Sequence, residues 1–179
     1  MKLFIITGES GSGKTTLVNA LTTLYPKKFK KVVTYTSRVK RINEIEGEDY
    51  FFVSQEYFQS HKNELILIKE TKDGFYGTPL QELYTCNHNL LLTSGASAIS
   101  KLLDKKITNL TLVTIEISEE LKILRMRDRG DSEQIIRDRM ITDQKKVYSP
   151  DLFGVPIITL QATSPVIQNA SILLRHITI

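Results

Sequence analysis

The stretch GESGSGKTT, residues 8–16, decides the fold of this protein. Its first eight residues match the phosphate-binding pattern G-x-x-x-x-G-K-[ST] at every fixed position. The apolar run at residues 3–7 predicts a buried strand before the loop, and Leu17, Leu21 and Leu24 follow at helical spacing. A strand, a glycine-rich loop and a helix in this order predict a P-loop that holds a nucleoside triphosphate. The alternative is a glycine-rich turn with no ligand.

The chemistry of the loop explains this order of residues. Glycines let consecutive backbone N–H groups turn inward around an anion, and the start of the following helix adds its dipole. Lys14 supplies a positive charge for the β and γ phosphates, and the Thr15 hydroxyl can ligate Mg²⁺. The residues that we expect to bind the triphosphate are Gly8, Glu9, Ser10, Gly11, Ser12, Gly13, Lys14, Thr15 and Thr16.

The composition narrows the class of protein. The chain has 179 residues, of which 41% are hydrophobic and 25% are charged, as is typical of one compact folded domain. Its net charge of +4 favours anionic ligands without demanding nucleic acid. The N-terminus lacks a signal-peptide pattern, and no stretch approaches the roughly 18 apolar residues of a membrane span. The single cysteine, Cys86, fits a reducing compartment, so we expect a cytoplasmic protein.

Predicted strands alternate with predicted helices along most of the chain. Besides residues 3–7, the segments 109–117 and 155–160 have the composition of buried strands. This alternation predicts a mostly parallel sheet with helices on both faces. Residues 33–79 break the alternation and predict an inserted β-rich lobe. Ser164, before a proline, is expected to cap the last helix.

Two consecutive helices are expected after the second of these strands. Ser118 is expected to cap the first, and Gly130 to close it. The second is expected over residues 131–146. Because a short Arg-Gly-Asp link joins them, this pair could act as a lid that excludes water.

A second anion site is suggested by the stretch TYTSRVKRINEIEGEDYFFVS, residues 34–54. Arg38 and Arg41 lie three residues apart, and Tyr50 follows nine residues after Arg41. Two guanidinium groups and a phenol can bind a phosphate through several hydrogen bonds. The alternative for this stretch by itself is a solvated basic loop. The stretch DGFYGTP, residues 73–79, by itself predicts only a hairpin bend.

Taken together, these stretches resemble the guanylate kinase family of nucleoside monophosphate kinases. The family signature R-x-x-R-x-x-E-x-x-G-x-D-Y-x-F is complete here as Arg38, Arg41, Glu44, Gly47, Asp49, Tyr50 and Phe52. The Y-G-[ST] motif of the family is present as Tyr76-Gly77-Thr78. The resemblance covers most of the chain. It implies an α/β fold of the three-layer P-loop NTPase type, with a mostly parallel sheet, an inserted β-rich NMP-binding lobe and a helical lid.

The resemblance also implies a division of the chain within a single domain. The core would comprise about residues 1–32, 80–124 and 148–179. The NMP-binding lobe would comprise about residues 33–79, and the lid about residues 125–147. The residues implied to clamp the phosphate of the acceptor are Arg38, Arg41, Tyr50 and Tyr76, and those implied to help read guanine are Thr34 and Thr78.

An arginine-rich stretch, LRMRDRGDSEQIIRDRM at residues 124–140, carries a third group of candidates. Arg125 and Arg129 lie four residues apart on one helix face, and further arginines follow in the next helix. Phosphoryl transfer needs positive charge on the transferred group, which converging arginines supply. The family pattern R-x-x-x-R-G, a linker and R-[LM] implies that Arg125, Arg129 and Arg139 are the catalytic arginines, with Arg137 as the alternative to Arg139.

Two carboxylates that guanylate kinases use to read guanine have no counterpart here. The residue nine positions before Tyr76, where the family has a glutamate, is Leu67, or Ile68 or Lys69 if the hairpin is shorter. Glu70 is the only carboxylate nearby, and it is out of register. The stretch at residues 91–96 contains no acid, and Ser94 stands where an aspartate is expected to contact the base. Loss of a charged hydrogen bond costs about 1.5–3 kcal/mol in binding, so the base preference stays open. The absent aspartate also supports Mg²⁺ in the family, so here Thr15 and the substrate phosphates would carry most of the Mg²⁺ binding.

The residues and the resemblance together predict an enzyme. It would use ATP and Mg²⁺ to phosphorylate GMP or dGMP, with Lys14, Arg125, Arg129 and Arg139 as catalytic residues. It would act as a monomer or homodimer on small nucleotides, with no nucleic acid or membrane as partner. One alternative is a kinase of the same fold for another acceptor, either another nucleoside monophosphate or a ribose bisphosphate. Further alternatives are a non-catalytic module that binds peptides and a nucleic-acid-dependent P-loop ATPase.

Overall fold

The structure is a computed structural model that describes residues 1–42, 44–144 and 154–177. The expected end of the lid at residue 147 and the expected start of the last core segment at residue 148 lie outside the described residues. Among the described residues, no helix is both long and apolar enough to cross a membrane.

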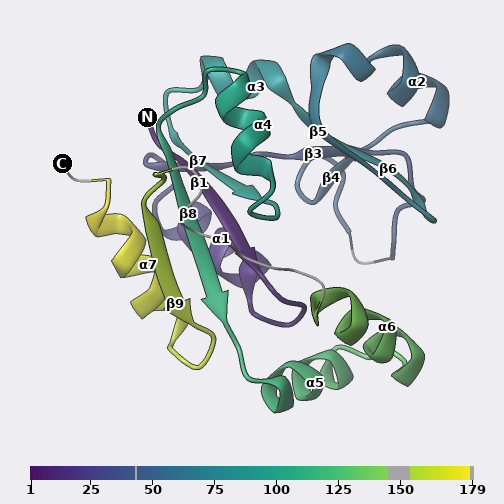
Figure 1. The fold of residues 1–179 in the computed structure, drawn as a ribbon, viewed down its shortest axis with the longest axis vertical. Coiled ribbons are helices and arrows are strands. Elements are labelled where there is room, and N and C mark those ends of the chain that lie inside the picture. Colours follow the sequence, from purple (N-terminus) through teal and green to yellow (C-terminus); the bar gives the residue numbers. More distant parts are fainter. Residues whose placement is uncertain (43, 145–153, 178–179) are drawn as a thin grey trace.

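The core of the protein is a five-stranded sheet whose strands are all parallel (Figure 1). In spatial order its strands are β2 (Phe29–Lys31), β7 (Asn89–Thr93), β1 (Leu3–Gly8), β8 (Leu110–Glu116) and β9 (Ile157–Gln161). The central strand β1 is buried on both faces, which explains its continuous run of apolar residues. The prediction of a mostly parallel sheet is confirmed.

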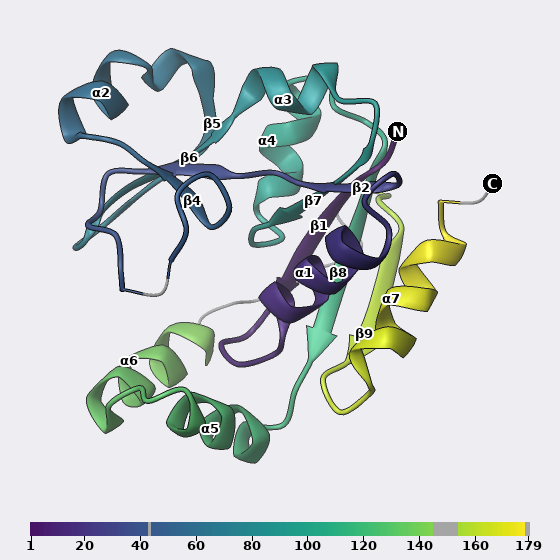
Figure 2. The same cartoon turned by 180° about the vertical axis from the view of Figure 1, so that it is seen from behind.

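Helices cover both faces of this sheet. Alternate residues of β1 point to opposite faces, so Phe4 packs in one hydrophobic cluster and Ile5 in the other. The first cluster includes α1 (Lys14–Leu24) and α7 (Val166–Arg175), which lie in front of the sheet in Figure 2. The second cluster includes α3 (Leu80–Thr85) and α4 (Ala98–Asp104), two short helices that periodicity did not predict. The predicted three-layer arrangement is confirmed.

A second sheet lies to one side of the core (Figure 1). In spatial order its strands are β4 (Tyr50–Phe52), β3 (Thr34–Thr36), β6 (Gly74–Pro79) and β5 (Leu65–Thr71). Helix α2 (Gln55–Ser60) and a turn of 3-10 helix (Lys62–Glu64) connect β4 to β5. Strands β5 and β6 form an antiparallel hairpin with an irregularity between Ile66 and Lys69.

Helices α5 (Glu119–Asp128) and α6 (Glu133–Gln144) lie beyond the carboxyl ends of β1 and β8 (Figure 1). The hydroxyl of Ser118 accepts a hydrogen bond from the backbone N–H of Leu121 at 3.3 Å, as expected of an N-cap. Gly130 has φ +86° at the end of the helix, a left-handed conformation that glycine adopts without strain.

The expected start of the last helix was wrong by one residue. Its N-cap is Pro165, where no side chain makes a capping hydrogen bond. Ser164 instead closes the preceding turn, since its backbone N–H donates to the carbonyl of Gln161 at 3.1 Å. The local turn therefore takes the place of the predicted serine cap.

Candidate active site

Close packing at one position and a left-handed backbone at another make glycine necessary in the P-loop. A Cβ atom on Gly8 would lie 2.8 Å from the carbonyl oxygen of Ile115 and from the hydroxyl of Ser12. Gly13, which precedes α1, has φ +96° in the left-handed region. The loop therefore stays close to β8 and turns sharply into the helix, as an anion-binding loop must.

One cavity, of about 730 Å³, surrounds this loop. The residues that line it are Ser10, Gly11, Ser12, Gly13, Lys14, Thr15, Thr16, Leu17, Tyr50, Thr93, Ile115, Arg125, Arg129, Arg139, Ala162, Ser164, Val166 and Asn169. We call it the loop cavity. Within the described part of the chain, the hydroxyl of Ser12 is the only buried side-chain oxygen or nitrogen without a hydrogen-bond partner. A bound phosphate oxygen would satisfy this hydroxyl.

Lys14 lies over the loop itself. Its ammonium group donates hydrogen bonds to the carbonyl oxygens of Gly8 at 2.9 Å and Glu9 at 2.7 Å. These carbonyls hold the ammonium next to the backbone N–H groups of the loop. A bound anion would therefore accept hydrogen bonds from the ammonium and from these N–H groups.

Thr15 is the candidate magnesium ligand. No group of three or more His, Cys, Asp or Glu side chains with metal-binding geometry occurs among the described residues. Mg²⁺ commonly keeps several waters and binds one or two protein oxygens together with substrate phosphates. A single threonine hydroxyl beside a phosphate site therefore suits Mg²⁺ held mainly by the nucleotide.

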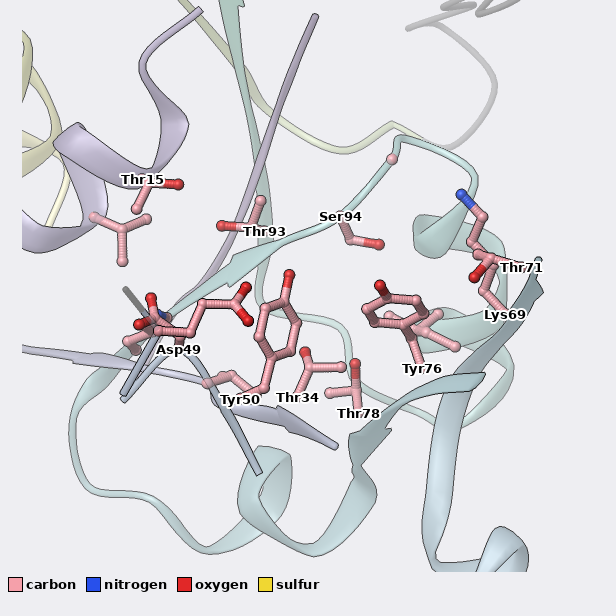
Figure 3. Close-up of a pocket in the computed structure, with 16 residues that line it drawn as sticks. Thr15, Thr34, Asp49, Tyr50, Lys69, Thr71, Tyr76, Thr78, Thr93 and Ser94 are labelled. Atoms are coloured by element: carbon pink, nitrogen blue, oxygen red, sulfur yellow. The ribbon is translucent and has the colours of Figure 1, made fainter. Parts of the chain in front are cut away.

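A second cavity, of about 530 Å³, lies between the parallel sheet and the second sheet (Figure 3). We call it the acceptor cavity. Its lining includes five residues expected from the sequence to contact the acceptor, namely Thr34, Tyr50, Tyr76, Thr78 and Ser94. These residues come from β3, β4, β6 and the end of β7, so only the packing of the two sheets brings them together. Leu67 lines the same cavity.

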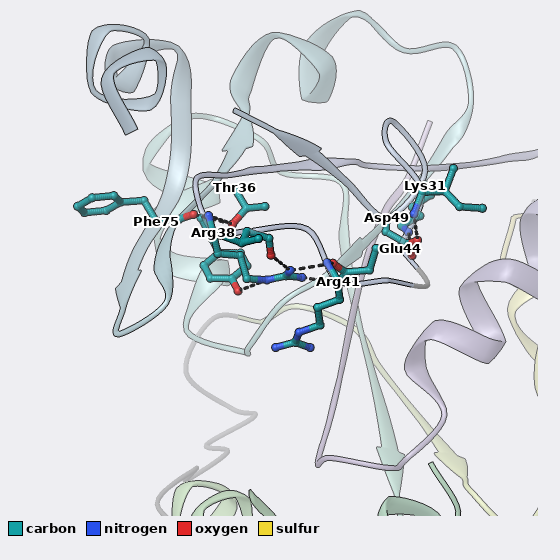
Figure 4. A network of polar contacts seen from close by, with 10 residues as sticks. Lys31, Thr36, Arg38, Arg41, Glu44, Asp49 and Phe75 are labelled. Atoms are coloured by element: carbon teal, nitrogen blue, oxygen red, sulfur yellow. Dashed lines mark hydrogen bonds and ion pairs between the residues drawn. The ribbon is translucent and has the colours of Figure 1, made fainter. Parts of the chain in front are cut away.

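Arg38 is almost completely buried beside this cavity (Figure 4). Its Nε donates to the hydroxyl of Tyr76 at 2.9 Å, and its two terminal nitrogens bind both oxygens of Glu44. Nη1 also donates to the carbonyl of Val39 at 2.8 Å. Four of the five N–H groups of the guanidinium are thus used, and one remains for an acceptor phosphate.

The charges around Arg38 follow from these contacts. Hydrogen bonding to Glu44 raises the pKa of Arg38 and lowers the pKa of Glu44, so this pair stays ionised. Burial raises the pKa of Tyr50, and the guanidinium of Arg38 lies 5.0 Å from the centre of its ring. The rings of Tyr50 and Tyr76 are 5.7 Å apart. The phenols of Tyr50 and Tyr76 therefore lie beside one fixed positive charge.

Arg41 is exposed and lies apart from the buried pair. Its backbone N–H donates to Glu44 at 2.9 Å, while its side chain points away from Arg38 in Figure 4. Burial is the main cause of a lowered pKa at Arg139, and Arg129 and Arg41 add repulsion that lowers it further. Arg41 on the lobe and Arg139 on α6 are therefore close enough to repel each other.

The arginines of α5 and α6 have different surroundings. Arg125 is fixed to the loop, because its guanidinium donates to the carbonyls of Gly11 at 3.1 Å and Ala162 at 2.8 Å. Arg129 and Arg139 both bind the carboxylate of Asp131 and both line the loop cavity. Arg137 is exposed and donates to Gln134 at 3.2 Å, so the structure places Arg139, and not Arg137, at the loop.

Sequence reasoning missed two contacts that fasten α5 and α6 to the P-loop. Lys122 is 3% exposed, and its ammonium lies 2.7 Å from the carboxylate of Glu9, which turns the side chain of Glu9 toward α5. Asp143 is also 3% exposed and accepts a hydrogen bond from the backbone N–H of Ser10. The spacing could have predicted Asp143, because a residue four positions after Arg139 lies on the same face of the helix.

Thr93, a lining residue of the acceptor cavity, was also missed, and Lys69 was only one of three positions considered for the absent glutamate. Thr93 ends β7 next to Ser94 and lines both the loop cavity and the acceptor cavity. Lys69 lies two positions after Leu67 on β5 and lines the acceptor cavity. Thr93 could have been expected, because ligands bind at the carboxyl ends of parallel strands.

Comparison with known proteins gives consistent matches. The family model described as guanylate kinase matches residues 1–159. The guanylate kinase of Mycoplasmoides gallisepticum is 30% identical over 162 residues, covering 87% of this chain and 83% of the relative. That of Malacoplasma penetrans is 33% identical over 185 residues, covering 98% and 91%. The crystal structure of guanylate kinase from Anaplasma phagocytophilum superposes with a TM-score of 0.59 at 18% identity, covering 97% of this chain and 84% of that chain, which shows the shared fold.

Proposed function

The chain belongs to the guanylate kinase family, and from this premise we propose that it transfers the γ-phosphate of ATP to GMP or dGMP. The single observation that best supports this reaction is the meeting of the two cavities. Thr15, Tyr50 and Thr93 line both the loop cavity and the acceptor cavity. A triphosphate at the loop and a monophosphate in the acceptor cavity would therefore face each other, as direct phosphoryl transfer requires.

On the donor side, the P-loop would bind the phosphates of ATP. The inward N–H groups and Lys14 would neutralise the phosphate oxygens, and the hydroxyl of Ser12 would gain the partner that it lacks in the described part of the chain. Thr15 would hold Mg²⁺, which supplies positive charge at the transferred phosphate. The loop N–H groups, Lys14 and Thr15 thus divide the binding of the triphosphate.

On the acceptor side, the phosphate would lie near Arg38, Arg41, Tyr50 and Tyr76. Because Glu44 fixes Arg38 in place, the one remaining N–H of Arg38 is already oriented before the substrate binds. Arg41 is exposed, so its side chain would be free to move and bring a second positive charge to the acceptor phosphate. Residues 33–79 would then act as the acceptor-binding lobe.

Residues 125–147 would act as the lid. Arg129 and Arg139 line the loop cavity from the lid side, and the positive charge of Arg41 on the lobe helps to lower the pKa of Arg139. These positive charges repel one another until a phosphate lies between them, so substrate binding would favour closure. Arg125 would stabilise the loop, because both of its terminal nitrogens already bind backbone carbonyls.

A coupled assay for ADP formation tests this proposal with ATP, Mg²⁺ and each of GMP, dGMP, AMP, CMP and UMP. We expect turnover with GMP and dGMP. A folded protein that phosphorylates none of them would refute the proposal. We infer that the protein acts in the cytoplasm on small nucleotides alone, without nucleic acid, membrane or a second protein as partner. It would do so as a monomer or a homodimer.

A kinase for a different acceptor is the second candidate. It is favoured by one observation, that Leu67 and Ser94 line the acceptor cavity where a guanine-binding carboxylate is expected. Ribose bisphosphate as an added acceptor in the same assay separates the two, because it carries no base.

A further inference from the structure

The acceptor cavity has different chemistry at its two ends. Its two carboxylates are Glu44 and Asp49, and Figure 3 shows Asp49 at the end opposite to Lys69. Glu44 accepts hydrogen bonds from Arg38 and from the backbone N–H of Arg41. Asp49 accepts one from the backbone N–H of Ile45 at 2.9 Å. Neither carboxylate is available to a base at the far end.

The far end is formed by hydrogen-bond donors. Figure 3 shows Lys69 and Thr71 at the end of the cavity opposite to Asp49, with Ser94 and Thr78 between these ends. The hydroxyl of Thr71 is already engaged with the carbonyl of Gly74 at 2.9 Å. Among the described residues, no hydrogen bond or ion pair involves the ammonium of Lys69, the hydroxyl of Ser94 or the hydroxyl of Thr78. From its middle to this end, the cavity therefore offers one ammonium and two hydroxyls, those of Ser94 and Thr78, to a ligand.

A β-bulge places Lys69 in the cavity. In the hairpin Ile66 pairs with Thr78 and Lys69 pairs with Tyr76, so two residues of β5 lie opposite the single residue Gly77. Leu67, in the bulge, has φ +56°, an uncommon conformation for a residue other than glycine. Directly paired residues share a face of an antiparallel sheet. Without the bulge Ile68 would face the cavity beside Tyr76, and with it Lys69 does.

We propose that Lys69 donates a hydrogen bond to the carbonyl edge of the acceptor's base, so that the protein phosphorylates 6-oxopurine monophosphates as a class and not guanine nucleotides alone. This inference rests on the proposed function. A 6-oxopurine presents two acceptors on this edge, the 6-oxo group and N7, which match an ammonium and hydroxyls. Adenine presents an amino group at position 6, a donor that the ammonium of Lys69 opposes.

The 2-amino group is what separates guanine from hypoxanthine. It is a donor, and it is read strongly only by a carboxylate. At this end of the cavity it meets at best a neutral hydroxyl, such as that of Ser94. A neutral hydrogen bond discriminates by about 2- to 12-fold and a charged one by about 12- to 160-fold. IMP and GMP are therefore substrates of similar quality.

The experiment is the coupled assay with GMP, IMP and AMP on the wild-type protein and three variants. Lys69→Ala removes the ammonium, Lys69→Glu replaces it with an acceptor, and Lys72→Ala is the matched control. Lys72 is an exposed lysine of the same hairpin that does not line the cavity. Thermal melting of each variant checks that it is folded.

We expect the wild-type kcat/KM for IMP to lie within about 10-fold of that for GMP, and that for AMP to be at least about 100-fold lower. Lys69→Ala lowers the values for GMP and IMP together by about 10- to 100-fold, and Lys72→Ala leaves both unchanged. Lys69→Glu places an acceptor against the 6-oxo group and N7, so it lowers the values for GMP and IMP at least as much as Lys69→Ala does, and it narrows the gap to AMP, whose 6-amino group is a donor.

Two results would overturn the inference while leaving the proposed function intact. One is a wild-type preference for GMP over IMP above about 100-fold, which would mean that a charged group reads the 2-amino group. The other is a Lys69→Ala variant with unchanged kinetics for both 6-oxopurines. Absence of turnover with every nucleoside monophosphate would instead refute the proposed function, and this inference with it.

Discussion

The carboxylate of Asp143 on α6 accepts a hydrogen bond from the backbone N–H of Ser10 in the P-loop, at 2.9 Å and across 133 positions of sequence. Asp143 is 3% exposed, so its charge is largely removed from solvent. Ser10 lines the loop cavity. A protein carboxylate therefore occupies an N–H group of the kind that a phosphate oxygen would use.

Removal of this charge should strengthen ATP binding. Asp143→Asn keeps the shape of the side chain but removes the negative charge that competes with the triphosphate for the loop. We expect the dissociation constant of a non-hydrolysable ATP analogue to fall about 5-fold or more by calorimetry. Asp138→Asn, at an exposed site on the same helix, is the control. Weaker binding by Asp143→Asn would mean that the carboxylate instead holds the loop in its binding shape.

Lys14 should be necessary for transfer. Lys14→Met keeps the length of the side chain and removes the charge beside the phosphates. We expect kcat/KM for ATP to fall about 10²- to 10³-fold in the coupled assay, as for loss of one group that stabilises transition-state charge. Lys27→Met, at an exposed position after α1, should have no effect. Near-normal activity of Lys14→Met would exclude the assigned role.

Arg139 and Arg137 should differ sharply. Arg139 lines the loop cavity, whereas Arg137 is exposed and binds Gln134. We expect Arg139→Ala to lower kcat about 10²-fold or more with a smaller change in KM, since its charge acts mainly on the transferred phosphate. Arg137→Ala should change kcat less than about 2-fold. Equal losses in both variants would contradict this assignment.

The Arg38–Glu44 pair should make stability depend on acid pH. The pKa of Glu44 lies below its ordinary value because Arg38 binds its carboxylate. A group with a lowered pKa in the folded state stabilises the protein above its ordinary pKa, and this contribution is lost as pH falls through the folded value. We therefore expect the wild type to lose stability between about pH 5 and pH 3, and Glu44→Gln to lose less over that range.

Urea unfolding at several pH values measures this effect. At neutral pH the Glu44→Gln variant should be less stable by about 1–3 kcal/mol, because the buried guanidinium loses its charged partner. Glu48→Gln, at an exposed carboxylate of the same loop, should follow the wild-type curve. If Glu44→Gln also follows it, the pair does not control acid stability.

A carboxylate at position 94 should restore the reading of guanine. Ser94 lines the acceptor cavity, and Ser94→Asp would offer a charged acceptor to the base. We expect the ratio of kcat/KM for GMP to that for IMP to rise about 10-fold or more, as for one charged hydrogen bond. Ser100→Asp, on α4 outside the cavity, should leave this ratio unchanged. An unchanged ratio for Ser94→Asp would show that residue 94 does not contact the purine edge.

The fold was predicted well where a hydrophobic pattern extends over many consecutive residues. The apolar run before the P-loop, the helical spacing after it and the alternation of strands and helices each predict a structure that the protein has. The short helices α3 and α4 were missed because six or seven residues hold too few turns for a periodic pattern. The capping role of Ser164 was wrong because a turn to Gln161 uses its backbone N–H.

The sequence by itself determined the family, the parallel sheet and the P-loop, because each depends on residue types at short, fixed spacing. Only the tertiary structure decided which side chains share a cavity. Asp143 reaches Ser10 because α6 folds back on the loop, and Lys69 faces Tyr76 because a bulge of β5 shifts the alternation of the strand by one residue. Neither contact follows from spacing along the chain, since both depend on how distant elements pack.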